Sequence, residues 1–486
     1  MSLEDIRDER IRKFESLNQK GIYPYPASLE RTHTIATVLK RFSGLAESKK
    51  SVAVVGRLMS RREHGGAVFF DVEDGSSRIQ AYARHNALGD AFSLFGEAAD
   101  IGDFLEIKGT AFETKKGEKT IDVTEWRMLA KSLLPLPEKW HGLQDIEERF
   151  RKRYLDLLMN ETVRERFEIR SRIIQALRAF HEERGFLEVE TPMLHPIPGG
   201  ALARPFVTHH NALDTDFYLR VAPELYLKRL LVGGWERVYE IGKSFRNEGI
   251  DAAHNPEFTE LESYAAYWDE EDMMKFVEEL FVSLAKTFGK NQTVQHQEQE
   301  ITFKKPFSRV PFKELLARYA LVSDYERETS QSLAVRAKQL GLELDPNQAK
   351  GKIADEIYKK ICRPYVIQPT FLTHHPLDIS PLAKKREEKP DEVRRFQLLA
   401  GGAELANAFS ELNDPIDQRG RFEEQERERS QGDQEAHRID EEYIEAMEYG
   451  MPPAAGLGIG VDRLVMLFTD TKNIREVVLF PTLRPK

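Results

Sequence analysis

The densest group of polar residues in the chain lies between two strand-like segments, residues 238–241 and 264–267. It contains Arg246, His254, several glutamates and Phe258. The order of strand, polar loop and strand places these ionisable groups together on one hairpin, which favours a functional site. The alternative is a solvated turn, but an ordinary turn rarely needs this mixture of groups.

A glycine-rich segment near the C-terminus is the second candidate. Gly456, Gly458 and Gly460 allow a close approach of the backbone and precede a helix-like apolar run. Their GxGxG spacing differs from the dinucleotide fingerprint, and no strand–helix–strand unit surrounds them. The segment therefore fails as a dinucleotide fingerprint.

Composition narrows the class of protein. A formal net charge of −10 argues against a uniformly basic nucleic-acid binder but leaves a local RNA site open. One cysteine, Cys362, excludes internal disulfides and zinc sites built on paired thiolates. The pairs His209–His210 and His374–His375 would point to opposite sides of a strand, so we reject a zinc site there. The sequence has no membrane-spanning run and no signal peptide, which predicts a cytoplasmic protein.

The 486 residues suggest about three domains, in an α+β multidomain protein. Residues 1–50 are expected to form a helical arm. Residues 51–131 show five short strand-like runs separated by turns, which predicts a small barrel, most often an OB-fold. A proline-punctuated hinge linker, residues 132–150, leads to a large mixed α/β domain, residues 151–486.

Three segments of the last domain resemble the signature motifs of class II aminoacyl-tRNA synthetases: residues 167–192, 240–267 and 456–468. Further segments resemble the lysine-specific family; they are residues 198–201, 203–206, 222–228, 380–384 and 404–414. The order and number of these motifs make the resemblance specific. It implies an OB-fold anticodon-binding domain and a catalytic domain built on an antiparallel sheet flanked by helices.

The resemblance implies an ATP-dependent ligase. Such an enzyme converts L-lysine and ATP to lysyl-adenylate and pyrophosphate, then transfers the lysyl group to the 3′ end of tRNA(Lys). Positioning and cationic stabilisation supply most of this catalysis, and Arg246 and Arg463 resemble the catalytic arginines. Phe258 and Arg463 would sandwich the adenine ring. The implied ATP-binding residues are Arg246, Glu248, His254, Asn255, Phe258, Glu404 and Arg463.

Lysine carries two ammonium groups, so we expect acids at both ends of its pocket. Glu262 and Tyr264 resemble the pair that receives the ε-ammonium, and Glu224 with the Gly200 carbonyl resembles the α-amino site. The implied lysine-binding residues are Gly200, Glu224, Arg246, Glu262, Tyr264, Asn407, Phe409 and Glu411. For each carboxylate the alternative is a surface or ion-paired structural role.

Two positions depart from the family pattern. Glu404 resembles a magnesium ligand, but Gln397 stands where relatives carry a second acid. An amide carbonyl can still coordinate Mg²⁺, although one formal charge is missing, so the number of ions stays open. Ala253 stands where relatives often carry a basic or hydroxyl side chain.

The barrel resembles the family's anticodon-binding module. Phe69 and Gln80 match residues that stack on and read the central anticodon base, and Arg78 is a nearby cation. The alternative for Phe69 is a barrel-core role, because Phe69 and Phe70 must face opposite ways.

The family also implies a homodimer formed through the region of the Phe167 helix, and no membrane association. Two other functions stay open. One is a synthetase-like paralogue that lysylates a protein; the barrel counts against it. The other is an inactive tRNA-binding regulatory protein, which the retained ATP-site residues disfavour.

Overall fold

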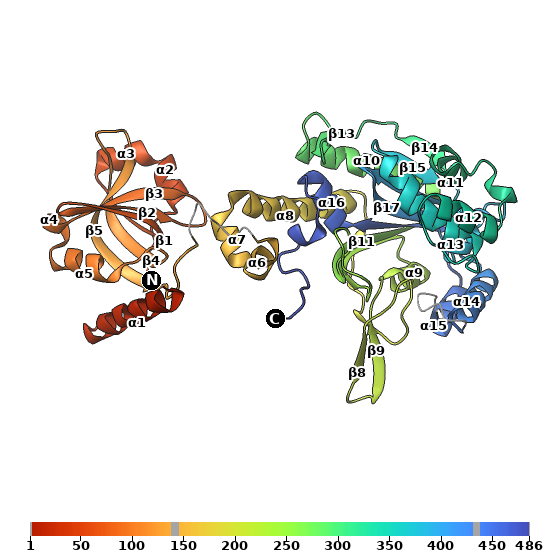
Figure 1. Ribbon diagram of the computed structural model, residues 1–486, viewed down its shortest axis with the longest axis horizontal. Helices are drawn as coiled ribbons and strands as arrows, with labels where there is room; N and C mark the ends of the chain where they lie inside the picture. The colour runs from red at the N-terminus through yellow and green to blue at the C-terminus, as the bar shows by residue number, and fades with distance from the viewer. Residues whose placement is uncertain (1, 138–144, 431–437, 486) are drawn as a thin grey trace. The chain divides into compact units, whose positions relative to one another are not determined.

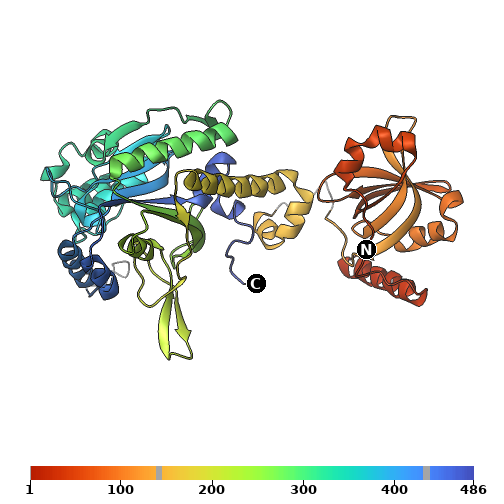
Figure 2. The same ribbon diagram turned by 180° about the vertical axis from the view of Figure 1, so that it is seen from behind.

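The computed structural model describes residues 2–137, 145–430 and 438–485. The chain forms two compact units, Met1–Gln144 and Asp145–Lys486 (Figures 1 and 2). The division falls within the predicted linker. Residues 138–144 of that linker lie outside the described residues, and Ile146–Arg151 forms helix α6 of the second unit.

The first unit is built on a closed five-stranded barrel in the order β1-β2-β3-β5-β4, which confirms the predicted OB-fold architecture. Its strands are β1 (Ser51–His64), β2 (Ala67–Glu73), β3 (Arg78–Arg84), β4 (Phe104–Glu113) and β5 (Lys119–Ala130). Its helices are α1 (Leu3–Gln19), α2 (Ile35–Lys40), α3 (Phe42–Ser48), α4 (His85–Leu88) and α5 (Asp90–Ala98).

Strict alternation of burial builds this barrel. On β2, Val68, Phe70 and Val72 are buried in the core, whereas Phe69 and Asp71 lie on the outer face. Side chains of a strand point alternately to its two faces, so an apolar residue at every second position closes the core. Helices α1, α2 and α3 of the predicted arm contribute to the same core.

The second unit contains an eight-stranded sheet in the order β14-β15-β16-β17-β18-β11-β10-β6. The six central strands pair antiparallel, as predicted; the edge strands β14 and β6 pair parallel to their neighbours, which the prediction did not include. The sheet strands are β6 (Leu187–Glu188), β10 (Arg237–Phe245), β11 (Glu257–Ala266), β14 (Ser308–Pro311), β15 (Thr370–Thr373), β16 (Arg395–Ala400), β17 (Ala403–Ser410) and β18 (Ala454–Gly460). The remaining strands are β7 (Leu194–His195), β8 (Val207–His210), β9 (Thr215–Leu219), β12 (Thr293–His296) and β13 (Gln299–Thr302).

Helices cover the sheet on both sides (Figure 1). Helices α8 (Glu161–Glu182), α10 (Glu270–Phe288) and α16 (Val461–Phe468) pack on one face through the largest apolar cluster. Helices α9 (Glu224–Val232), α14 (Pro415–Ser430) and α15 (Glu441–Glu448) contribute to another cluster with Val238 and Tyr264. The other helices are α7 (Arg153–Met159), α11 (Phe312–Leu315), α12 (Ser330–Gln339) and α13 (Lys350–Ile357). No helix in the described residues is long and apolar enough to cross a membrane.

Along the central strands, apolar core residues and polar site residues alternate between the two faces of the sheet. On β11, Leu261 and Ala265 join the helix-covered core, while Glu262 and Tyr264 point to the opposite face. On β18, Leu457, Ile459 and Ala455 join that core in the same way. The glycines between them share a face with Glu262, because Glu262 pairs with Gly458 and Tyr264 with Gly456. This second face therefore carries polar residues of the predicted motifs, among them Glu262 and Tyr264.

Candidate active site

Two residues predicted to receive the lysine ε-ammonium lie together on β11. Glu262 and Tyr264 are both buried, and the Tyr264 hydroxyl donates to Glu262 Oε2 at 2.8 Å. Burial and the neighbouring carboxylates of Glu260 and Glu224 raise the pKa of Glu262 well above its ordinary value. A buried acid surrounded by other acids is stabilised by a cationic ligand, so this position suits an ammonium group.

The predicted acids Glu224 and Glu411 meet around a lysine of the chain itself. The Lys228 Nζ atom lies 2.5 Å from Glu224 Oε1 and also forms an ion pair with Glu411. All three side chains are buried, and Lys228 lies 5.3 Å from the centroid of the Phe409 ring. Burial raises the pKa of Glu411 to about 8, despite the opposing effect of Lys228. Glu411 thus has an internal counter-ion.

Two glycines make room for this cluster. A Cβ atom on Gly456 would lie 2.1 Å from Glu411 Oε1 and 2.4 Å from Tyr264 Cε1. Gly200 has a φ of +90°, and a Cβ there would lie 3.0 Å from the Glu224 Cβ. Gly200 therefore lies against Glu224, and these are the two residues predicted for the α-amino site. Neither Gly456 nor Gly200 has space for a larger side chain.

The polar loop between β10 and β11 brings Arg246 beside Phe258. The Arg246 guanidinium carbon is 4.9 Å from the centroid of the Phe258 ring, and its Nη2 is 4.0 Å from Glu260 Oε2. Its Nε donates to the backbone oxygen of Val221 at 3.4 Å. Arg246 is about one-third exposed, so part of the fork faces solvent and can reach an anion.

Arg463 lies in the first turn of helix α16, within the third motif, and reaches the same loop. Its Nη2 donates to His254 Nε2 at 3.1 Å, while His254 Nδ1 lies 2.9 Å from Asp251. Burial lowers the pKa of Arg463. The guanidinium recorded against Phe258 is that of Arg246, and the predicted adenine sandwich of Phe258 and Arg463 stays a prediction.

Asn255 is buried in this loop. Its Nδ2 donates to the Glu257 backbone oxygen at 2.6 Å, whereas its Oδ1 is buried without a hydrogen-bond partner among the described residues. Such an acceptor suits the amino group of an adenine edge. Glu248, also among the implied ATP-binding residues, is exposed on the loop.

The two residues predicted for magnesium face other groups of the chain. Gln397 is buried, and its Oε1 accepts a hydrogen bond from the Tyr358 hydroxyl at 2.8 Å. Glu404 Oε2 lies 3.9 Å from an Arg363 guanidinium nitrogen. Within the described residues, no group of three His, Cys, Asp or Glu side chains is arranged to hold a metal ion. The donor set does not fit a magnesium site held by the protein alone.

Asn407 belongs to the same sheet face, opposite Gln397 in register. Its Oδ1 accepts a hydrogen bond from Arg395 Nε at 2.9 Å, and Arg395 also bonds Ser380. Ser380 lies in the lysyl-type segment 380–384. The structure therefore connects two motifs that are distant in sequence.

In the first unit, the three predicted anticodon residues share the outer face of β2 and β3. Phe69 stacks on Tyr82 with ring centroids 4.5 Å apart, and Phe70 instead packs in the core against Phe95. Gln80 Oε1 accepts from Thr120, while Arg78 pairs with Asp71 at 2.5 Å. The half-exposed Phe69–Tyr82 stack is a platform of the kind that binds unpaired bases.

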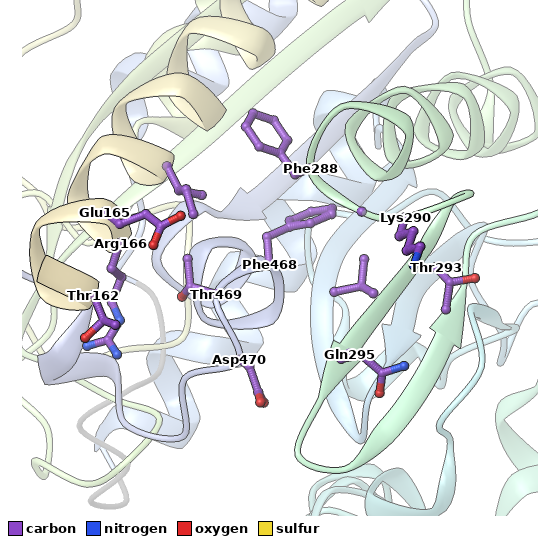
Figure 3. A pocket seen from close by; sticks show the side chains of 13 residues that line it. Thr162, Glu165, Arg166, Phe288, Lys290, Thr293, Gln295, Phe468, Thr469 and Asp470 are labelled. Carbon is purple, nitrogen blue, oxygen red and sulfur yellow. The ribbon is translucent and has the colours of Figure 1, made fainter. Parts of the chain in front are cut away.

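A separate cavity of about 410 Å³ lies between α8, the end of α10, β12 and the end of α16 (Figure 3). Its lining includes Glu165, Arg166, Phe288 and Asp470, and none of the predicted site residues. The cavity is therefore not part of the candidate active site.

Three residues near the site were missed by the sequence reasoning. Lys228 follows Glu224 by four positions on one helix, a spacing that indicates an ion pair. Glu260 precedes Glu262 by two positions and so shares its face of β11. Arg363 had no local signal, because only the fold brings it to Glu404.

Comparison with known proteins assigns both units. Residues 145–484 match the family of class II tRNA synthetases (D, K and N), and residues 52–129 match the OB-fold nucleic acid binding domain. Similar proteins include the lysine–tRNA ligases of Pelotomaculum thermopropionicum and Carboxydothermus hydrogenoformans, each 50% identical over 100% of this chain and over 96% and 99% of their own lengths. The lysine–tRNA ligase of Roseiflexus castenholzii is 49% identical over the full length of both chains. The chain therefore belongs to the class II tRNA synthetases, in the family of the lysine–tRNA ligases.

Proposed function

We propose that this protein is a lysine–tRNA ligase that activates L-lysine with ATP and charges tRNA(Lys). The observation that carries the proposal is the buried Glu262–Tyr264 pair on the sheet face opposite the largest apolar cluster. An acid kept in this environment favours a ligand with an ammonium group and disfavours neutral or acidic side chains. Glu224, beside Gly200, is the proposed partner of the α-amino group.

The first step joins lysine to AMP. A lysine carboxylate oxygen attacks the α-phosphorus of ATP, the bond to the β-phosphate breaks, and pyrophosphate leaves. Arg246 is proposed to hold the α-phosphate and the lysine carboxylate, which its fork suits. Arg463, Phe258 and Asn255 are proposed to hold the adenine, and His254 the terminal phosphates. Mg²⁺ is proposed to enter with ATP as the counter-ion of its phosphates.

The second step transfers the lysyl group from the adenylate to the 3′ end of tRNA and releases AMP. The OB-fold barrel is proposed to bind the anticodon through Phe69, Gln80 and Arg78. Stacking on aromatic faces needs no broad positive field, which agrees with the negative net charge of the chain. We also propose a homodimer formed through the region of α8, as the family resemblance implies.

Pyrophosphate exchange with each of the twenty amino acids, followed by charging of total tRNA, tests the proposal. Lysine alone should support rapid exchange, and tRNA(Lys) alone should be charged. Lysine-dependent exchange without any tRNA charging would favour lysylation of a protein. The absence of exchange would favour an inactive regulatory protein.

A further inference from the structure

Arg363 lies beside the candidate ATP site and has no role in the proposed mechanism. It begins the short 3-10 turn Arg363–Tyr365, directly after the π-helical turn Tyr358–Cys362. These two turns form one continuous segment, residues 358–365. The segment reaches both residues that the sequence suggested for magnesium: Tyr358 bonds Gln397, and Arg363 faces Glu404.

The fold holds this segment firmly against the turn between β16 and β17. Gly401 and Gly402 form that turn with φ values of +60° and +74°, and their backbone N–H groups donate to Ile367 and Val366 at 2.8 and 3.0 Å. A Cβ on Gly402 would lie 3.2 Å from the Pro364 carbonyl oxygen. The turn ends two residues before Glu404, so the same contacts set the distance between Arg363 and Glu404.

The charges around Glu404 are predominantly positive. Arg363 faces its carboxylate, and Arg463 Nη1 lies 3.5 Å from its backbone oxygen. Electrostatic interactions also link Arg463 to Arg363, Arg246 and Asp251. Three guanidinium groups therefore lie in this region, and the carboxylates beside them are those of Glu404, Asp251 and Glu260. Guanidinium groups clustered in this way suit the several oxygens of a phosphate chain.

Arg363 also keeps unused bonding capacity. Its Nε is buried without a hydrogen-bond partner among the described residues, and its contact with Glu404 is long at 3.9 Å. The side chain is about one-quarter exposed, so its fork is accessible to a ligand. A buried guanidinium N–H without a partner is unfavourable, and a phosphate oxygen would satisfy it.

We propose that Arg363 binds the phosphate chain of ATP, supplying a fixed positive charge where a protein-held magnesium ion would need a second carboxylate. This inference rests on the proposed function for the identity of ATP as substrate. The neutral Gln397, which accepts a hydrogen bond from Tyr358, agrees with it. A carboxylate at position 397 would add a negative charge that repels phosphate, whereas the amide adds none. Metal-free ATP therefore retains measurable affinity for this protein.

Titration calorimetry of the full-length protein with ATP, in EDTA and without lysine, tests this directly. Arg363→Gln should weaken metal-free ATP binding about tenfold or more, as expected for a lost charge-assisted bond. Arg363→Lys should recover part of the affinity, because it restores charge without the fork. Arg318→Gln, which removes an exposed arginine paired with Glu314, is the matched control and should bind ATP as the unaltered protein does.

Gln397→Glu is an independent test. The added carboxylate should weaken ATP binding in EDTA, and addition of Mg²⁺ should restore the affinity. Lysine binding, measured in parallel, should stay unchanged in every variant and reports that the sheet is intact. Unchanged metal-free ATP affinity in Arg363→Gln would overturn the inference. Loss of lysine-dependent pyrophosphate exchange in the unaltered protein would instead overturn the proposed function, so the two failures are distinguishable.

Discussion

Replacing Glu262 by glutamine tests the assignment of the lysine pocket most sharply. Glu262 is only 6% exposed and accepts a hydrogen bond from Tyr264 at 2.8 Å. Glutamine has nearly the same shape and keeps an acceptor for that hydroxyl, so the substitution removes the charge and little else. A bound lysine ammonium would then be buried without its counter-ion.

The expected effect follows from that burial. Removing one partner of a buried ion pair costs about 3–5 kcal/mol, and each 1.4 kcal/mol is a factor of about ten in affinity. The KM and Kd for lysine should therefore rise by about 100-fold to several thousandfold. The KM for ATP should stay within about twofold, because the substitution leaves Arg246 on the loop and Phe258 at the start of β11 unchanged.

Stability separates this effect from simple damage to the fold. Burial and two neighbouring acids raise the pKa of Glu262, so its ionised form is unfavourable in the free protein. Glu262→Gln removes this unfavourable charge, and the melting temperature should be equal or higher. Lysine binding to the unaltered protein should release protons, since the ligand cation lowers the raised pKa.

Pyrophosphate exchange at varied lysine and ATP concentrations gives both KM values, and calorimetry in two buffers of different ionisation enthalpy counts the protons. Glu271→Gln, which removes an exposed acid paired with Arg309, serves as the control. A lysine KM within fivefold of the unaltered value in a folded Glu262→Gln variant would refute the pocket assignment.

Three further predictions concern other parts of the molecule. Lys228→Met leaves the buried acids Glu224 and Glu411 without their counter-ion, so the free energy of unfolding, measured by urea titration, should fall by about 3–5 kcal/mol. The double variant Lys228→Met/Glu411→Gln should recover part of this loss. The pKa of Glu411 is raised from 4.5 to about 8, so between these pH values the folded state binds more protons than the unfolded state, and the free energy of unfolding should fall as pH rises from 5 to 8. Glu411→Gln should flatten this pH dependence, and an unchanged dependence would contradict the role of Glu411. Phe69→Ala should raise the KM for tRNA(Lys) about tenfold or more while lysine-dependent pyrophosphate exchange stays unchanged, and equal tRNA kinetics would exclude Phe69 from the anticodon contact.

Much of the fold was predictable because its signals are local. The alternation of Val68, Phe70 and Val72 indicates a half-buried strand wherever it occurs, and the barrel follows from several such strands. The edge strands β6 and β14 were not predicted, since they are short and their parallel pairing depends on distant partners.

The candidate site divides in the same way. The roles of Arg246, Glu262 and Arg463 were predicted from the family resemblance of the motifs that contain them. The structure brings Glu411 and Tyr264 together at Gly456, and Lys228 joins Glu411 to Glu224. The counter-ion between Glu224 and Glu411 was not found. Whether a carboxylate faces a ligand or a lysine of the chain depends on side-chain positions that the motif pattern does not contain.

The sequence by itself determined the family, the motif residues and the opposite faces of Phe69 and Phe70, because motifs and the period of two in a strand are local properties of the chain. Only the tertiary structure decided which charges meet. Lys228 reaches Glu411 because α9 packs over the sheet, and Arg363 reaches Glu404 because a turn of two glycines is bonded to the segment beside it. Contacts between residues 41 to 183 positions apart are set by register and packing, and Coulomb interactions act only once those distances are short.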